Sequence, residues 1–105
     1  MCFLKIYSDK QSFKEFALAT RIPVYSVFDK GEFRSKRAKK PIEQYVISLD
    51  VSKKDWDEFK LQVQDAIEFL SSHTEELKKL IQTHDITDAY LDFLNRPGFT
   101  GDSRV

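Results

Sequence analysis

The order of strand-like and helix-like segments constrains the fold of this chain more than any single motif does. In the strand patterns apolar side chains recur at every second residue, and in the helical patterns they recur at every third or fourth. The order along the sequence is strand, helix, strand, strand, helix, strand. The expected segments cover residues 2–7, 9–20, 24–28, 44–51, 53–84 and 86–94.

This β-α-β-β-α-β order predicts the fold class. It is the split βαβ pattern of ferredoxin-like α+β domains, so we expect a four-stranded antiparallel sheet in the order 4-1-3-2, with helices packed on one face. Residues 1–94 then form a single domain, and residues 95–105, which are rich in turn-forming residues, form a tail. The core is predicted to include Leu4, Ile6, Phe13, Phe16, Val27, Ile47, Leu49, Trp56, Phe59, Val63, Ile67, Leu70, Leu91 and Phe93.

The second helical pattern is too long to be one straight helix in a domain of this size. A continuous helix over residues 53–84 would be about 48 Å long at 1.5 Å per residue. Ser72 and Glu75 have the spacing of a capping box, in which two side chains cap the backbone amides at the start of a helix. We therefore predict a break near residues 71–74.

Composition and charge narrow the range of protein classes. The chain has 105 residues, of which 17 are basic and 17 acidic, so no net charge draws it toward nucleic acids or membranes. No apolar run approaches the roughly 18 residues that a membrane span needs, and the first residues do not show the pattern of a signal peptide. The single cysteine excludes an internal disulfide, and we expect a cytoplasmic protein.

Residues that could carry catalysis or bind a metal are few. A nucleophile would be Cys2, with His73 or His84 as its base, but Cys2 lies on the apolar face of the first strand, where cysteine usually acts as a small core residue. The spacing of the nearest acidic residues matches no recognised metal site. We therefore predict no enzyme activity, no cofactor and no metal, although the nearest candidate metal ligands are His84, Asp85, Asp88 and Asp92.

The segment between the second and third strands, residues 29–41, is the strongest electrostatic feature. It carries six basic and two acidic residues, a net charge of +4, and Phe33 lies among them. Basic side chains beside an aromatic ring suit contacts with phosphates and bases. The third strand lacks the glycines of the RNA-recognition motif, and the aspartates expected on the open sheet face would repel phosphate. Nucleic-acid binding is thus the alternative function, with Arg34, Lys36, Arg37, Lys39 and Lys40 as candidate residues.

A short motif resembles a known family. Residues 24–32, which read Val-Tyr-Ser-Val-Phe-Asp-Lys-Gly-Glu, are similar to the strand that ends in Lys-Gly-Glu in bacterial DUF4279 domains. The basic segment that follows, the strand that begins near Tyr45 and the leucine-rich stretch from Phe69 to Leu80 extend the resemblance over residues 3–94. The family usually has a tryptophan where this chain has Tyr45. It implies no established activity, but some of its members resemble immunity proteins that neutralise a partner toxin.

The main functional prediction is a small non-enzymatic module that binds another protein. The resemblance implies an immunity-like or inhibitor-like form of this binding. An open sheet face and an exposed edge strand are the natural contact surfaces. Phe3, Tyr7 and Tyr90 are expected to be exposed side by side on the open face, and such a patch predicts a homodimer.

Overall fold

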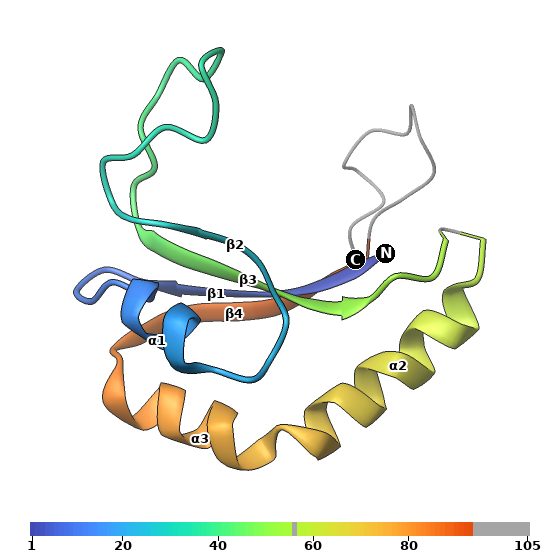
Figure 1. Cartoon of the computed structure of the whole chain (residues 1–105). Coiled ribbons are helices and arrows are strands. Elements are labelled where there is room, and N and C mark those ends of the chain that lie inside the picture. The colour runs from blue at the N-terminus through green and yellow to red at the C-terminus, as the bar shows by residue number, and fades with distance from the viewer. Residues whose placement is uncertain (56, 94–105) are drawn as a thin grey trace.

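The computed structural model describes residues 1–55 and 57–93, which form a four-stranded sheet with helices on one of its faces (Figure 1). The strands are β1 (Cys2–Ser8), β2 (Val24–Phe28), β3 (Tyr45–Ser52) and β4 (Ile86–Phe93). The helices are α1 (Lys14–Ala19), α2 (Phe59–Ser72) and α3 (Thr74–Thr83). The predicted α+β class and four-stranded antiparallel sheet are confirmed. Trp56 and the predicted tail at residues 95–105 lie outside the described residues.

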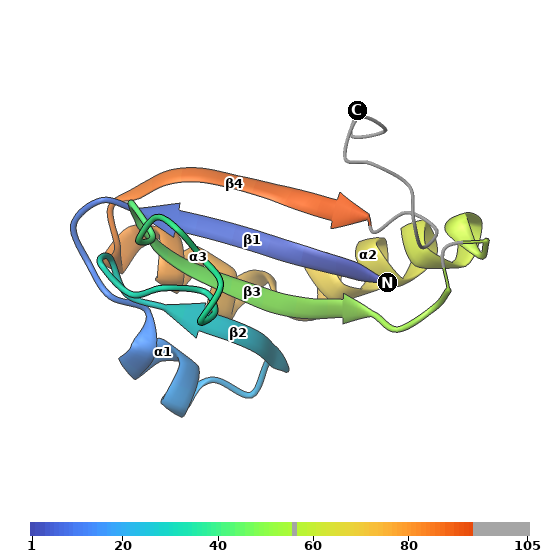
Figure 2. The same ribbon diagram turned by 90° about the horizontal axis from the view of Figure 1, so that it is seen from above.

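The register of the sheet decides which side chains face the helices. Neighbouring strands are antiparallel and their order is β2-β3-β1-β4, which is β4-β1-β3-β2 from the other edge (Figure 2). Leu4 in the central strand β1 lies opposite Leu49 in β3 and Leu91 in β4. Opposite residues share a face of the sheet, so these three side chains point toward the helices. Their neighbours in sequence point toward the opposite, open face.

The first helix begins later than the sequence pattern indicates. The Ser8 hydroxyl accepts hydrogen bonds from the amides of Lys10, at 3.2 Å, and Gln11, at 3.3 Å. These bonds close a turn at the end of β1 instead of capping a helix, and α1 begins only at Lys14. The Ser8 hydroxyl therefore stabilises a turn, as serine side chains often do.

Ser52, at the end of β3, also uses its hydroxyl group to close a turn. Its hydroxyl accepts a hydrogen bond from the amide of Lys54, at 3.2 Å, and donates one to the carboxylate of Asp65, at 2.7 Å. The second contact ties β3 to the middle of α2. The helix itself begins at Phe59, six residues after the predicted start at Lys53.

The predicted break in the long helix is confirmed. α2 ends at Ser72 and α3 begins at Thr74, with His73 between them at φ −114° and ψ 18°. Backbone hydrogen bonds continue through the bend, since His73 donates to the carbonyl of Phe69 at 3.1 Å and accepts from Leu77 at 3.0 Å. The helical segment thus changes direction without losing its hydrogen bonding and follows the sheet along its length (Figure 1).

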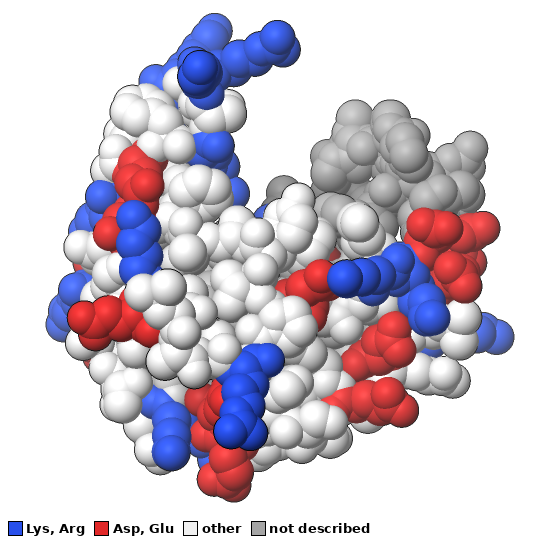
Figure 3. Space-filling view, in the orientation of Figure 1, with Lys and Arg blue, Asp and Glu red and all other residues white. Residues whose placement is uncertain are grey.

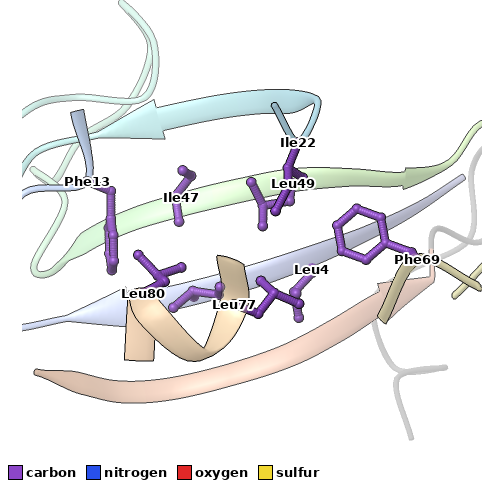
Figure 4. Packing of buried hydrophobic residues seen from close by; sticks show 9 residues of the cluster. Leu4, Phe13, Ile22, Ile47, Leu49, Phe69, Leu77 and Leu80 are labelled. Atoms are coloured by element: carbon purple, nitrogen blue, oxygen red, sulfur yellow. The ribbon is translucent and has the colours of Figure 1, made fainter. Parts of the chain in front are cut away.

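The hydrophobic core lies between the sheet and the helices (Figure 4). Burial of a large apolar side chain stabilises a fold by about 1.5–3 kcal/mol before the loss of chain entropy is counted. Phe16, Val27 and Leu91 are half-buried against this cluster, and Val63 and Phe93 are also half-buried. The buried cluster consists of Leu4, Ile6, Phe13, Ile22, Ile47, Leu49, Phe69, Leu77 and Leu80.

The predicted core of α2 is wrong at three positions. The sheet-facing line of the helix contains Phe69, which is not among the predicted core residues, and Gln62, which is 1% exposed. The side-chain amide of Gln62 donates to the carbonyl of Asp55 at 2.6 Å, whereas its buried Oε1 has no hydrogen-bond partner among the described residues. The helix is therefore rotated about its axis, and the predicted core residues that it exposes are Phe59 (55%), Ile67 (61%) and Leu70 (39%).

Candidate functional site

Residues 29–44, here called the basic loop, join β2 to β3 and rise from the open face of the sheet (Figure 1). The loop has a narrow base that two backbone hydrogen bonds close. The amide of Gly31 donates to the carbonyl of Ile42 at 2.8 Å, and the amide of Ile42 donates to the carbonyl of Glu32 at 2.7 Å. Gly31 has φ +93°, a conformation that side-chain-bearing residues rarely adopt. The glycine thus sets the turn with which the loop leaves β2.

Both acidic residues at the start of the loop bind α1. The ammonium group of Lys14 lies 2.9 Å from the carboxylate of Glu32 and 3.7 Å from that of Asp29. The carboxylate of Asp29 also accepts a hydrogen bond from the hydroxyl of Ser12. The backbone amide of Asp29 donates to the carboxylate of Glu32 at 2.6 Å. The hydrogen bond from Lys14 is the main reason that the pKa of Glu32 lies below its usual value, and the same contact raises the pKa of Lys14.

The middle of the loop, residues 33–41, carries five basic residues and no acidic one, and Glu43 follows it. We call this part the loop tip. Figure 3 shows the corresponding separation, with Lys and Arg side chains gathered at the far end of the loop and acidic ones nearer the sheet. The net charge of +4 that the sequence assigns to the segment is therefore concentrated in the part that projects furthest from the fold.

Of the five predicted binding residues, two line a cavity beside the sheet and the other three lie outside it. Arg34 and Lys40 line a cavity of about 310 Å³ between the loop and the sheet, together with Tyr7, Pro41 and Gln44. Lys36 lines a separate hollow with Phe33 on the loop tip. The remaining two, Arg37 and Lys39, are exposed on the tip. The sequence placed all five on one loop but gave no sign of this division.

Two side chains in or beside the cavity are held by contacts with the sheet. The guanidinium carbon of Arg34 lies 5.7 Å from the centre of the Phe28 ring, within the range of a cation–π interaction. The hydroxyl of Tyr7 lies 3.1 Å from that of Tyr90, and their rings are stacked with centres 5.9 Å apart. Burial, and then the bond to Tyr90, raise the pKa of Tyr7 to about 12, so its hydroxyl stays protonated at neutral pH.

The open sheet face differs from the expected patch of exposed rings. Phe3 is only 4% exposed and packs against Tyr25, with ring centres 4.3 Å apart. Lys5 forms an ion pair with Asp92 at 3.0 Å. The expectation that Phe3 is exposed there is wrong, because the ring of Tyr25 in β2, the strand beyond β3, lies against it. Homodimer formation itself stays a prediction.

A second surface, which the sequence pattern did not reveal, lies beside β4. α2 packs mainly against β3, and Asp65 on one flank of α2 is tied to β3 through Ser52. On the opposite flank the Phe59 ring lies 5.2 Å from that of Phe93 in β4. Ala89, which shares the helix-facing side of the sheet with the buried Ile6, is exposed. We call this surface the β4-side strip and define it by Phe59, Val63, Ile67, Leu70, Ala89, Leu91 and Phe93.

The residues considered for nucleophilic catalysis are not assembled into a site. Cys2 is fully buried, and burial raises the pKa of its thiol to about 11, so the nucleophilic thiolate is scarce at neutral pH. His84 lies just before β4, at the far end of β1 from Cys2, and a strand of this length spans about 20 Å. The ring of His73 packs against Phe69, with ring centres 4.8 Å apart.

The candidate metal ligands near β4 are also separated. Asp92 and Asp85 pair with two different lysines, at 3.0 and 3.4 Å, and the ring of His84 stacks on Phe13. One group of carboxylates within the described residues does lie close together, with ligand atoms within 4.8 Å of one another. All its members are exposed, and such clusters are common on protein surfaces; they are Asp55, Asp57 and Glu58.

Comparisons with known proteins leave the identity of the chain open. No protein-family model, curated protein or solved structure matches it. The resemblance to DUF4279 domains therefore stays a prediction that rests on the sequence motif alone. Within the part of the chain that the structure describes, no helix combines the length and the apolar character needed to cross a bilayer.

Proposed function

We propose that this chain is a small non-enzymatic module that binds another protein, and that the partner docks on the β4-side strip. The observation that carries this proposal is the exposure of large apolar side chains beside a free strand edge. Phe59, Ile67 and Leu70 are 55%, 61% and 39% exposed, although all three lie on one line of α2. Contiguous apolar surface of this kind usually marks an interaction site.

The position of β4 supports the same proposal. Within the described residues β4 pairs with β1 and has no strand on its outer side. An edge strand presents free backbone donors and acceptors to which a partner can add a strand. A partner that supplied one extended segment would therefore gain backbone hydrogen bonds from β4 and apolar contacts from α2 at the same time.

We infer further that the fold is ferredoxin-like. The sheet order, read as β4-β1-β3-β2, and the succession of strands and helices support this class. An immunity-like role, in which the chain neutralises an effector by occupying its surface, is the form of protein binding that the resemblance to DUF4279 domains implies. It is compatible with a module whose contact surface is an edge strand and one helix flank.

A double variant of the strip tests the main proposal. Ile67→Asp with Leu70→Asp places two charges on exposed positions, so the fold should persist while partner binding is lost. Leu18→Asp is the matched control, because Leu18 is 89% exposed on α1, away from β4. Each variant is affinity-purified from the native cell, and the partner is identified by mass spectrometry.

We expect one partner to be retained by the wild type and by the Leu18→Asp control and lost from the strip variant. Light scattering on the purified chain shows whether that partner is a second copy, since a monomer has a mass of 12.3 kDa. Retention of the partner by all three proteins would contradict docking on the strip. A turnover that survives purification and depends on one side chain would contradict a non-enzymatic role.

Nucleic-acid binding is the second candidate, and the observation that favours it is the loop tip without an acidic residue. Neutralising several phosphates makes affinity fall steeply with salt. A Lys36→Ala, Arg37→Ala, Lys39→Ala variant should therefore bind a single-stranded oligonucleotide less tightly and show a shallower salt dependence than the wild type. Equal affinity and equal salt dependence in the two proteins would exclude this use of the loop tip.

A further inference from the structure

The cavity between the basic loop and the open sheet face has the composition of an anion-binding site. It has a volume of about 310 Å³, at the lower end of the range of roughly 300–1,000 Å³ that is usual for small-molecule sites. Arg34 and Lys40 both line it, and Glu43 is the one carboxylate among the lining residues. The acidic residues at the loop base do not line it, because Asp29 and Glu32 are engaged with Lys14.

The donors of this cavity come from different elements and differ in kind. Arg34 offers a planar fork of N–H groups, and its position is fixed in part by the Phe28 ring beneath it. Lys40 also lines the cavity, and its side chain ends in a compact ammonium group with three donors. Tyr7 projects from the sheet, and when the Tyr90 hydroxyl donates to it, the proton of Tyr7 is free to donate to a ligand.

Three donors of this kind favour a tetrahedral anion over a planar one. A carboxylate has two oxygens in one plane and is satisfied by the arginine fork alone, whereas a phosphoryl group has three terminal oxygens that accept from separate directions. The volume of the cavity exceeds that of a phosphate ion and leaves room for the group to which the phosphate is attached. The three donor groups of the cavity, which belong to a tyrosine, an arginine and a lysine, therefore suit the three terminal oxygens of a phosphate ester.

We propose that this cavity binds the phosphoryl group of a phosphate ester, with Arg34 and Lys40 neutralising its charge and Tyr7 donating a hydrogen bond. This site is distinct from the β4-side strip, since it lies on the open face of the sheet and uses none of the strip residues. It shares Arg34 and Lys40 with the candidate nucleic-acid surface but does not use Lys36, Arg37 and Lys39. The phosphate can belong to a free mononucleotide-sized ligand or to the end of an oligonucleotide.

Binding to AMP, measured by NMR titration at low ionic strength, tests the proposal, with adenosine as the ligand that lacks the phosphate. We expect saturable binding of AMP with shifts at Tyr7, Ala38 and Ile42, and much weaker binding of adenosine. An Arg34→Gln, Lys40→Gln variant should bind AMP at least tenfold more weakly, because it removes both positive charges that line the cavity. Tyr7→Phe should weaken binding severalfold.

The matched control is a Lys36→Gln, Lys39→Gln variant, which removes the same charge from outside the cavity. All these variants change exposed or half-buried positions, and their thermal unfolding is measured to show that they fold. The proposal is overturned if the control loses as much affinity for AMP as the cavity variant does. It is also overturned if adenosine binds as well as AMP, or if AMP does not saturate at millimolar concentration.

A pair of oligonucleotides, one with a 5′-phosphate and one with a 5′-hydroxyl, distinguishes the two sources of the phosphate. Tighter binding of the phosphorylated oligonucleotide that is lost in the Arg34→Gln, Lys40→Gln variant supports an oligonucleotide end as the ligand. AMP binding without any preference between the oligonucleotides supports a free phosphate ester. Equal oligonucleotide binding that is lost only in the Lys36→Gln, Lys39→Gln variant, without AMP binding, overturns the cavity site and supports the loop tip alone.

Discussion

Lys14 in α1 and Glu32 in the basic loop face one another with 2.9 Å between their charged atoms, and this contact separates the charges of the loop. Glu32 also accepts the amide hydrogen bond of Asp29, so one carboxylate holds both the helix and the loop base. The acidic residues are thereby kept at the base, and the tip retains an uncompensated positive charge. The binding properties proposed for the loop therefore depend on a contact made outside its tip.

The first prediction concerns this contact. Glu32→Gln should loosen the loop base while the rest of the fold persists, so the amides of Gly31 and Ile42 should exchange faster with solvent, as measured by NMR. Acid should have the same effect on the wild type. The pKa of Glu32 is lowered in the folded state, so its stabilising contribution is present above its ordinary pKa of 4.5 and is lost as the pH falls through the folded value.

Glu15→Gln is the control for this experiment, because Glu15 is exposed in the first turn of α1 and its loss removes the same charge. Exchange at Gly31 and Ile42 should be unchanged in this variant. Equal exchange rates in the wild type and in Glu32→Gln would show that the contact does not hold the base.

The second prediction concerns Gly31. No atom lies within 4 Å of the position that a Cβ would take, so any cost of Gly31→Ala arises from the backbone angle φ of +93° and not from a clash. Left-handed backbone costs a residue with a Cβ about 1–2 kcal/mol, and we expect a loss of this size in chemical denaturation. Gly31→Asn should cost less, since asparagine tolerates positive φ better. Unchanged stability of Gly31→Ala would show that the turn can relax.

The strands were predictable because their signal is local. Period-two alternation in a half-buried strand identifies its residues and its inward face, and Leu4, Ile6, Ile47 and Leu49 are all buried as predicted. The starts of the helices were less predictable, because a serine followed by a donor three residues on caps a turn as readily as a helix. Ser8 caps such a turn, and the helix begins only after Phe13.

The orientation of α2 could not be read from its apolar pattern. Phe59, Ile67 and Leu70 make a continuous line on the helix, and a line of this kind normally faces the core. The sheet-facing line instead contains Gln62, a polar residue whose burial depends on a hydrogen bond to the carbonyl of Asp55. That bond joins residues seven apart in the sequence and leaves no trace in the apolar periodicity. The β4-side strip was missed for the same reason.

The sequence was enough to predict which basic residues the loop carries, but not how their side chains are arranged in space. The five basic residues are adjacent in sequence, so their common location needed no structure. Their division between cavity and tip depends on contacts with distant segments. Arg34 lies over Phe28 and shares the cavity with Tyr7 from β1, and neither contact is implied by spacing along the chain.

The third prediction concerns the titration of Tyr7. Its pKa of about 12 should appear as a phenolate absorbance change well above the ordinary value of 10.0, and this change should be missing in Tyr7→Phe. Tyr90→Phe should lower this pKa only partly, because burial is the larger cause. The raised pKa contributes stability that is present below the ordinary value of 10.0 and is lost as the pH rises toward 12. A Tyr7 that ionises near 10 would show that its ring is solvated.

The fourth prediction tests the rotation of α2, on which the β4-side strip depends. Phe69 and Leu70 are adjacent in the helix, but Phe69 is 8% exposed and Leu70 is 39% exposed. Phe69→Ala should therefore destabilise the protein by about 3–5 kcal/mol, because it opens a cavity between α2 and the sheet. Leu70→Ala should cost less than about 1 kcal/mol, since little buried contact is lost. Chemical denaturation measures both, and the opposite ranking would mean that Leu70 faces the sheet and that the strip is not exposed.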